Sequence, residues 1–441
     1  MQTLLSILLA LILLLFPSIP QEQIAAANAN SPAAPQEASN EASETLWGRS
    51  IAPAATEELP EEAFTGEYIV PVLLAHDGQS LLICGEPEPY LWNGETGAKT
   101  PLYLGDQRSC DAVREMILQA QANIASRTGV TEAPLDPDAL PDEELLQTYL
   151  ASSRAMNGQC LLFRAYDGYN ALGPYAHLYD TQGGSWILND ETGALYTRAT
   201  GTVDSVYEDQ LLVLQPRPEA RITIEKADGT QQTIALDGGF AGGTAMTAAT
   251  FLPDGSVCAV VRDQKLDINI GQECAVVIRH PDGKTEKYPL GKLKFGTEPD
   301  TIVSADARHV VVFNRTRVLQ THPFLIDRDD GAVSMLYTDG RGIAARPLAE
   351  CLDGATGAVI QPQEASLYVV SPLSDGETLL AYTFDNSTLM LWRPASMLSS
   401  FLFGSADRSS APVPVSLTGN GYDRWLYWST RALQLVTLQV K

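Results

Sequence analysis

The 441 residues carry 54 acidic and 29 basic side chains, which gives a formal net charge of −25 at pH 7. A negative field of this size repels phosphate backbones, so the composition excludes nucleic acid as a partner and gives no support to docking on anionic lipid through a polybasic segment. Hydrophobic residues make up 45% and charged residues 19%, an ordinary globular balance that can form a large core without metal or disulfide support.

The chain opens with an export signal. Leu4 to Phe16 form one apolar run, shorter than a membrane span and followed by two prolines. Ala27-Asn28-Ala29 has the pattern of a cleavage site, although the residues before the apolar run lack the usual basic charge. Residues 1–29 are therefore expected to be either a cleaved signal peptide or a retained N-terminal anchor. Either outcome predicts a secreted or extracytoplasmic body, which touches a membrane only through this segment if it is uncleaved.

Residues 30–64 are rich in Ala, Pro, Ser, Asn and Glu and contain few large apolar side chains. Such a composition buries too little surface to offset the entropy cost of ordering. We predict a flexible acidic linker that separates the export signal from a folded body spanning residues 65–441.

From residue 65 onward, short apolar strands alternate with Asp-Gly turns, as in Ile69–Leu74, Asp77-Gly78 and Leu81–Cys84. The same arrangement returns at 249–261, 302–313 and 367–382. Gly and Asp supply the positive-φ residues of tight hairpins, so the pattern predicts antiparallel β-sheet. A second hairpin turn recurs at intervals of 46, 54 and 48 residues, at Gly183, Gly229, Gly283 and Gly331.

Four strands in a repeat of this length are typical of propeller blades. On these turns and spacings the body resembles the WD40-like and TolB-like β-propeller superfamily. The sequence therefore predicts an all-β fold, a β-propeller of seven blades, with six or eight as open alternatives. The final stretch, 413–440, shows three strands only, and we expect the strand-like residues 46–51 to complete that blade and protect its edge.

One segment breaks the repeat, because between Gly105 and Gly158 the apolar period changes from two to about 3.6 residues. The first expected helix has an apolar face from Ala112 to Ile124 and stops at Gly129. The second begins near Pro141, with three acidic residues in its first turn. We predict a helical hairpin over residues 106–157, inserted after the first blade.

Six cysteines in an exported chain suggest disulfides. Cys258 and Cys274 lie on adjacent strands and would face each other if their hairpin turn centres near Leu266. Cys110 and Cys160 flank the helical insertion and would clamp its base. The alternative for all of them is a small apolar residue in the core.

No motif for a metal, a cofactor or a catalytic group stands out, since the chain has no C-x-x-C, H-E-x-x-H or G-x-S-x-G. No cofactor or metal is expected, and catalytic residues stay unidentified. In the last blade Trp425, Tyr427 and Trp428 form an aromatic cluster, and we single these residues out as candidates for stacking on a ligand.

The sequence leaves two functions open. The missing catalytic motifs, the linker and the inserted hairpin favour a binding or scaffolding module for a protein or cell-envelope component. The alternative is a carbohydrate-active hydrolase or lyase with carboxylates at the mouth of the central channel. Propellers host many functions, so the fold alone does not choose between them.

Overall fold

The computed structural model describes residues 43–44, 50–58, 64–65, 68–69, 72–74, 80–83, 89–93, 96–129, 135–157, 163–170, 174–180, 183–215, 221–314, 321–339, 342–372, 376–383, 388–404, 417–418, 422–428 and 433–440. Residues 1–29, which the sequence predicts to be an export signal, lie outside them. No helix within these ranges is both long enough and apolar enough to cross a membrane.

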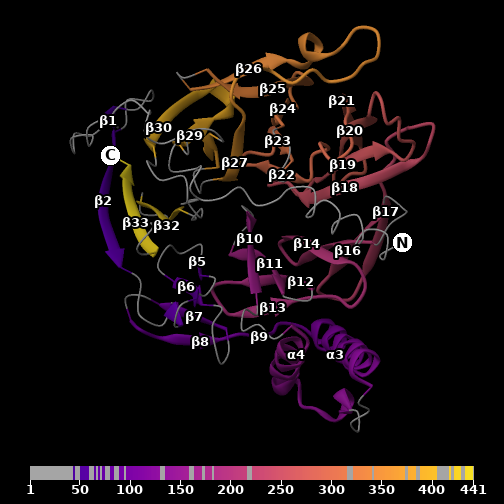
Figure 1. Cartoon of the computed structure of the whole chain (residues 1–441), viewed down its shortest axis with the longest axis vertical. Coiled ribbons are helices and arrows are strands. Elements are labelled where there is room, and N and C mark those ends of the chain that lie inside the picture. Colours follow the sequence, from indigo (N-terminus) through magenta and orange to yellow (C-terminus); the bar gives the residue numbers. More distant parts are fainter. Residues whose placement is uncertain are drawn as a thin grey trace, which may run out of the picture. The chain divides into compact units, whose positions relative to one another are not determined.

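The described strands form seven sheets of four or five strands, taken up one after another along the chain (Figure 1). The first sheet consists of β5 (Val72–Leu74), β6 (Ser80–Ile83), β7 (Tyr90–Asn93) and β8 (Lys99–Pro101). The second consists of β10 (Phe163–Asn170), β11 (Tyr175–Asp180), β12 (Ser185–Asn189) and β13 (Ala194–Tyr196), with β9 (Tyr103–Leu104) at its edge. The third consists of β14 (Thr202–Tyr207), β15 (Gln210–Leu214), β16 (Arg221–Lys226) and β17 (Gln231–Ala235). The fourth sheet consists of β18 (Thr244–Phe251), β19 (Val257–Asp263), β20 (Gln272–Arg279) and β21 (Thr285–Leu293). The fifth consists of β22 (Thr301–Ser304), β23 (His309–Phe313), β24 (Phe324–Asp327), β25 (Ala332–Thr338) and β26 (Ile343–Pro347). The sixth consists of β27 (Leu367–Pro372), β28 (Leu379–Thr383), β29 (Thr388–Arg393) and β30 (Leu398–Gly404).

The seventh sheet joins the two ends of the body. It runs in the order β1 (Ser43–Glu44), β2 (Ser50–Glu58), β33 (Leu433–Val440), β32 (Tyr422–Trp428), β31 (Leu417–Thr418). A separate pair consists of β3 (Phe64–Thr65) and β4 (Tyr68–Ile69). An N-terminal strand therefore does complete the last sheet, as expected. It is β2, which shares Ser50 and Ile51 with the expected segment 46–51 and continues into the segment expected to be linker. The pairing runs along β33 from Ile51 opposite Val440 to Glu58 opposite Gln434, and residues 46–49 lie outside the described part of the chain.

Consecutive sheets bury apolar layers between them, which is the packing of a β-propeller. Leu212 of β15 and Val261 of β19 belong to one such layer, and Val260 and Val312 belong to the next. Because sheets inside the stack are covered on both faces, β20 reads as an unbroken apolar run, with Ala275 to Ile278 fully buried. The all-β propeller fold predicted from the repeat is confirmed.

Turns also link neighbouring sheets. Arg328, in the turn after β24, has a side chain only 9% exposed and bonds Asp254 at 3.0 Å and Glu286 at 3.3 Å. Both carboxylates belong to the preceding sheet, so the guanidinium group fixes one sheet against the next. Ion pairs of this kind need every partner in place, since an unpaired buried charge is costly.

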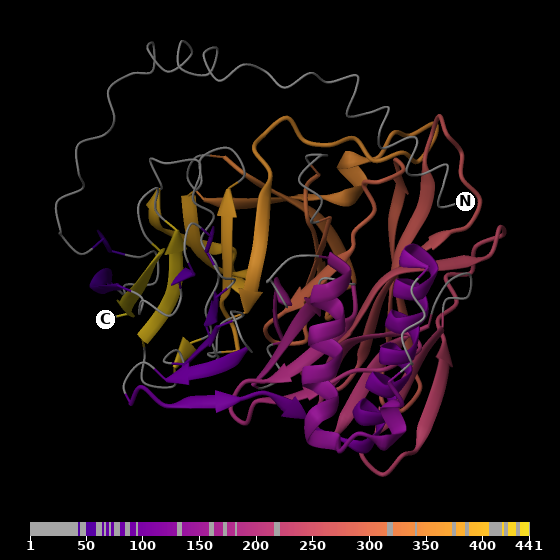
Figure 2. The same cartoon turned by 60° about the horizontal axis from the view of Figure 1, so that its bottom comes forward.

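The helical hairpin is confirmed. It consists of α3 (Gln107–Thr128) and α4 (Asp142–Asn157), which lie side by side in Figures 1 and 2, with the short helix η3 (Pro137–Ala139) between them. Asp106 caps α3 by accepting from the Ser109 amide at 2.7 Å. Gly129 ends it in the left-handed conformation, with φ 67°, which favours glycine. The remaining short helices are η4 (Leu348–Cys351) and η5 (Pro394–Ser396).

Cys258 and Cys274 do not form the expected disulfide. Cys258 stands opposite Ile278, and Cys274 stands opposite Arg262. The hairpin is thus centred on Ile268 rather than on Leu266, which separates the two cysteines along the ladder. Both thiols are free and buried, and burial raises the pKa of Cys274 to about 12.

The second expected disulfide, between Cys110 and Cys160, is not formed by Cys110 either. Cys110 is a free, buried thiol within α3, and burial raises its pKa. Cys160 lies outside the described residues. Cys110 therefore acts as a small apolar side chain under the hairpin, the alternative role that the sequence left open.

The closing strand gives a first testable prediction. A recombinant chain that begins at residue 60 lacks β2 and leaves the edge of β33 unpaired, whereas a chain that begins at residue 43 keeps it. We expect the shorter chain to melt about 1 to 3 °C lower, as a loss of about one to two kcal/mol would produce in a domain of roughly 400 residues. Thermal unfolding followed by circular dichroism measures the difference. Equal melting temperatures would contradict the closure of the last sheet by β2.

Candidate functional site

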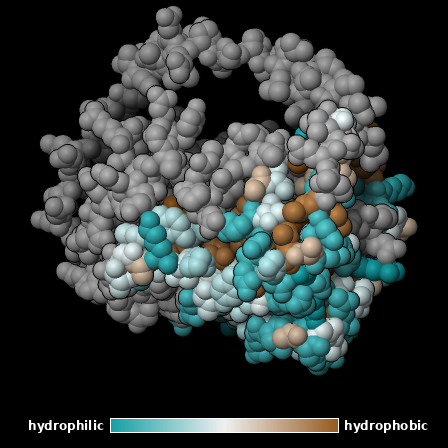
Figure 3. All heavy atoms as spheres, turned by 90° about the horizontal axis from the view of Figure 1, so that it is seen from below, coloured by the Kyte–Doolittle hydropathy of each residue, from teal (hydrophilic) through white to brown (hydrophobic). Residues whose placement is uncertain are grey.

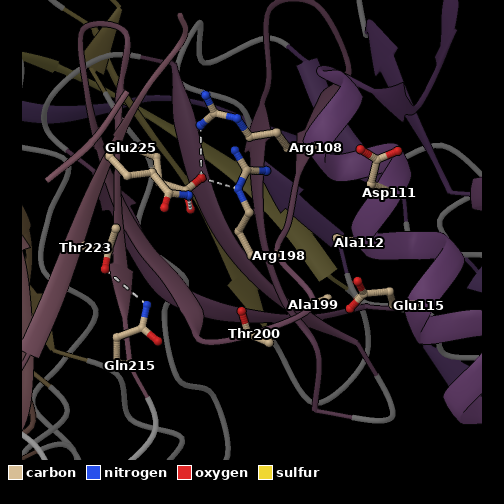
Figure 4. Close-up of a pocket in the computed structure, with 11 residues that line it drawn as sticks. Arg108, Asp111, Ala112, Glu115, Arg198, Ala199, Thr200, Gln215, Thr223 and Glu225 are labelled. Carbon is tan, nitrogen blue, oxygen red and sulfur yellow. Dashed lines mark hydrogen bonds and ion pairs between the residues drawn. The ribbon is translucent and has the colours of Figure 1, made fainter. Parts of the chain in front are cut away.

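A cleft of about 300 Å³ lies between the start of α3 and the sheet β14–β17 (Figure 4). The cleft is lined by α3, the connection from β13 to β14, Gln215 just after β15, and strands β16 and β17. The lining residues are Arg108, Asp111, Ala112, Glu115, Arg198, Ala199, Thr200, Gln215, Thr223, Glu225 and Gln231. All but two of them are polar or charged, so the cleft is suited to a polar group and not to an apolar one.

Glu225 is the centre of the cleft's hydrogen bonding. Its Oε2 accepts from Arg198 Nε at 2.5 Å and from an Arg108 guanidinium nitrogen at 3.2 Å, and its Oε1 accepts from Gln231 Nε2 at 3.0 Å. The Glu225 and Arg198 side chains are each only 8% exposed. A buried carboxylate is tolerated when both oxygens are bonded and the charge is paired, and Glu225 meets both conditions.

Arg198 extends the network to the beginning of α3. A second nitrogen of its guanidinium group donates to Asp106 Oδ2 at 3.0 Å, and Asp106 also caps the helix. Burial alone would raise the pKa of Asp106, but the hydrogen bonds from Ser109 and Arg198 and the charge of Arg198 hold that pKa below the ordinary value of 3.8. Asp106 is therefore ionised, and Arg198 joins β16 to the N-terminus of α3.

A second buried carboxylate holds α4. Asp180, at the end of β11, accepts from Tyr149 Oη of α4 at 2.7 Å, from Trp186 Nε1 at 2.9 Å and from the Gly184 amide at 2.8 Å. Asp180 is 3% exposed. Burial and the nearby negative charge both raise the pKa of Tyr149, so its hydroxyl stays protonated and donates. Both helices are thus tied to sheets by hydrogen-bonded carboxylates.

The cleft presents mainly hydrogen-bonding and charged groups. Its lining residues include no serine, cysteine or histidine, the side chains most often used as nucleophile or base. Nowhere in the described ranges do three or more His, Cys, Asp or Glu residues gather closely enough to hold a metal ion.

The aromatic residues singled out from the sequence are not among those that line this cleft. Trp425, Tyr427 and Trp428 all belong to β32, and their side chains lie outside the described part of the chain, so the stacking hypothesis stays a prediction. Sequence reasoning missed Asp106, Arg198 and Glu225. They stand on three different elements far apart in the chain, and no spacing motif connects them.

Comparisons with known proteins add a likeness of fold. No family model matches the chain, and no curated protein matches it. The β-propeller domain of Cps50 (Swd1) from Myceliophteria thermophila is 10% identical, over 89% of this chain and 100% of that one, with a TM-score of 0.41. A chain of the mitotic checkpoint complex is 10% identical over 93% and 96%, also at 0.41. An auxiliary nutrient binding protein from Bacteroides thetaiotaomicron is 11% identical over 63% and 68%, at 0.32. Likeness at this level carries no inference, and the propeller fold rests on the chain's own sheets.

The Asp180 anchor can be tested at Gly184. A Cβ atom at this position would lie 2.4 Å from Asp180 Oδ2, so Gly184→Ala must displace the carboxylate that Tyr149 and Trp186 share. We expect a loss of roughly 2 kcal/mol in the free energy of unfolding, as for other disrupted buried polar networks. Gly354→Ala is the control, because a Cβ there meets nothing within 4 Å. Denaturant unfolding measures both variants, and equal stability would show that Asp180 does not hold α4.

The Asp106 anchor predicts a pH dependence. Because the folded-state pKa of Asp106 is below the ordinary 3.8, its ionised form stabilises the fold above that pH, and this stability is lost as the pH falls through the folded value. Asp106→Asn keeps a good helix cap but has no charge to lose. We expect the wild type to be more stable than the variant near neutral pH, with a gap that closes in acid. Hydrogen exchange of α3 amides measures the gap, and a gap that is constant with pH would contradict the pairing with Arg198.

Proposed function

We propose that the protein is an exported binding or scaffolding propeller that recognises a protein or cell-envelope component through its helical hairpin. The observation that carries the proposal is the way the hairpin is held. Two buried, fully bonded carboxylates, Glu225 and Asp180, fix its helices to sheets of the propeller. A recognition element fixed in this way loses little conformational entropy when it binds.

The hairpin keeps apolar side chains exposed. Leu118 of α3 is 50% exposed, and Leu135, in the connection to α4, is 43% exposed. The two lie near each other, because Gln121 donates to the Leu135 carbonyl at 3.2 Å and stands one turn from Leu118. Figure 3 views the molecule from the end that carries the hairpin in Figure 1 and shows a mostly hydrophilic face there, with small hydrophobic areas. Apolar groups within a polar surround are typical of interface centres.

An ion-pair cluster stiffens the same face. Arg114 of α3 bonds Asp142 of α4 at 2.5 Å and Asp111 at 3.1 Å. These contacts tie the two helices together on the exposed side, and Arg114 stands one turn before Leu118 on α3. The hairpin therefore offers a preformed surface on which apolar and ion-paired acidic side chains lie close together.

The N-terminal sequence supports export and, with it, a partner in the cell envelope. An apolar run followed by an A-x-A pattern is typical of secretion, and the proposal places the body outside the cytoplasm on that ground. Glu225 in the cleft and Asp106 beside it are bound by arginine, which suits structural carboxylates and not the acid and nucleophile of a glycoside hydrolase. The cleft thus gives no support to the carbohydrate-active alternative.

The proposal is tested by crosslinked capture from envelope extract. The double variant Leu118→Glu and Leu135→Glu changes the surface without touching the buried anchors, and we expect it to retain at most about a tenth of the captured partner, as loss of an interface hot spot would predict. The captured protein is then purified and titrated directly against each form.

The matched control is Ile268→Glu with Phe295→Glu, two more exposed apolar residues beside β19 to β21, at 88% and 69% exposure. It adds the same charge away from the hairpin, so capture is expected to be unchanged. If the control variant loses the partner and the hairpin variant keeps it, the recognition surface is on that sheet. If no form captures a partner, the binding function itself is contradicted.

A further inference from the structure

The positive charges in the cleft are already compensated. Arg198 donates to Glu225, Asp106, Ser109 and the Thr197 carbonyl. Arg108 donates to Glu225 and to the carbonyl of Lys226. Two guanidinium groups thus face two carboxylates, and neither is available to attract an anion.

The acidic residues of α3 that line the cleft are Asp111, whose charge is paired with Arg114, and Glu115, whose negative charge is unpaired. Asp111 and Glu115 stand one turn apart on α3, and both line the cleft. Glu115 makes no hydrogen bond or ion pair with any described residue, and in Figure 4 it extends from α3 toward the cleft. Asp111 accepts from Gln107 and Arg114 through Oδ1 alone, which leaves Oδ2 open. The cleft therefore attracts a cation.

The neutral groups favour the same ligand. Gln215 donates through its amide nitrogen to Thr223 at 3.2 Å, which leaves its carbonyl oxygen as an acceptor. Thr200 adds a hydroxyl oxygen to the lining. With Asp111 and Glu115, the cleft thus holds an excess of open acceptors over donors. Lysine and arginine side chains are the reverse, since they carry several donors and no acceptor.

The volume of the cleft and the residues beside it restrict the class of ligand further. A volume of about 300 Å³ is at the lower end for ligand pockets and suits a single side chain. A metal ion is less suitable, because calcium needs six or more oxygens and no three His, Cys, Asp or Glu residues of the described ranges are placed to hold an ion. Leu118 follows Glu115 by three residues on α3, so an apolar contact lies beside the charge.

We propose that this cleft binds a lysine or arginine side chain of a partner polypeptide, next to an apolar residue that packs on Leu118. The inference rests on the proposed function and names the chemistry of its partner. The guanidinium or ammonium group bonds Glu115 and Asp111, while the net charge of −25 steers basic segments toward the protein.

The test uses the full folded chain and two labelled peptides, acetyl-Leu-Arg-Leu-amide and the same peptide with citrulline in place of arginine. Citrulline has the shape of arginine without its charge. We expect fluorescence anisotropy to show at least about tenfold tighter binding of the arginine peptide, the worth of one charge-assisted hydrogen bond. Glu115→Gln is expected to abolish that preference.

The matched control is Glu143→Gln, which removes the same charge from an exposed glutamate in the first turn of α4 that does not line the cleft. It is expected to keep the preference. Equal effects of the two variants would mean non-specific attraction to an acidic protein and would overturn the proposal. Equal binding of both peptides, or no binding up to about 10 mM, would overturn it as well. Displacement of the arginine peptide by spermidine at a lower concentration than by the unlabelled peptide would assign the cleft to small polyamines and overturn the polypeptide ligand.

Failure of this inference is separable from failure of the proposed function. If Glu115→Gln leaves envelope capture unchanged while the Leu118 and Leu135 variant loses it, the hairpin still binds the partner and the cleft does not. Loss of capture in Glu115→Gln, with capture retained in Glu143→Gln, supports both.

Discussion

The position of the helical hairpin against the sheets depends on Arg198. Its guanidinium group is almost fully buried, so its donors must be satisfied, and they reach Glu225 on β16 and Asp106 at the cap of α3. Because these partners belong to different elements, the side chain has good geometry only when α3 stands in one place against the sheet. A buried ion pair is weak evidence for stability, but its strict geometry explains how a helical insertion is held on a β-propeller at a defined position. Asp180 repeats the device for α4 through Tyr149.

These two anchors separate the inner side of the hairpin from the outer side. The inner side carries the buried polar network, and the outer side carries Leu118, Leu135 and the acidic groups that Arg114 joins. The cleft lies at the boundary, where the compensated arginines end and the open carboxylates of α3 begin. The proposed recognition of a basic and apolar segment uses two properties of the hairpin, its fixed backbone and the acidic side chains of α3. Binding through these two properties leaves the fold of the sheets unchanged.

Much of the fold was accessible from sequence because it is local. The 3.6-residue period and Gly129 place the hairpin within a residue of its observed ends, and the Asp-Gly turns reveal the repeating sheets. Register was not accessible: Cys258 and Cys274 were expected to face each other, but the turn between them is displaced to Ile268. The closing strand β2 resembles a linker in sequence because its Ala- and Pro-rich residues lack apolar alternation, and its pairing with β33 depends on the fold of the whole chain. The site was missed for the same reason, since Arg198 and Asp106 are brought together by tertiary packing.

Native-state hydrogen exchange of the full chain shows directly whether the hairpin is a rigid part of the propeller. In a rigid hairpin, the hydrogen-bonded amides of α3 from Cys110 onward and those of α4 around Tyr149 exchange as slowly as the amides of β16 and β11, the strands that hold them. If the hairpin amides exchange orders of magnitude faster than these strands, the helices open independently of the propeller. The anchors at Arg198 and Asp180 would then not fix the recognition surface.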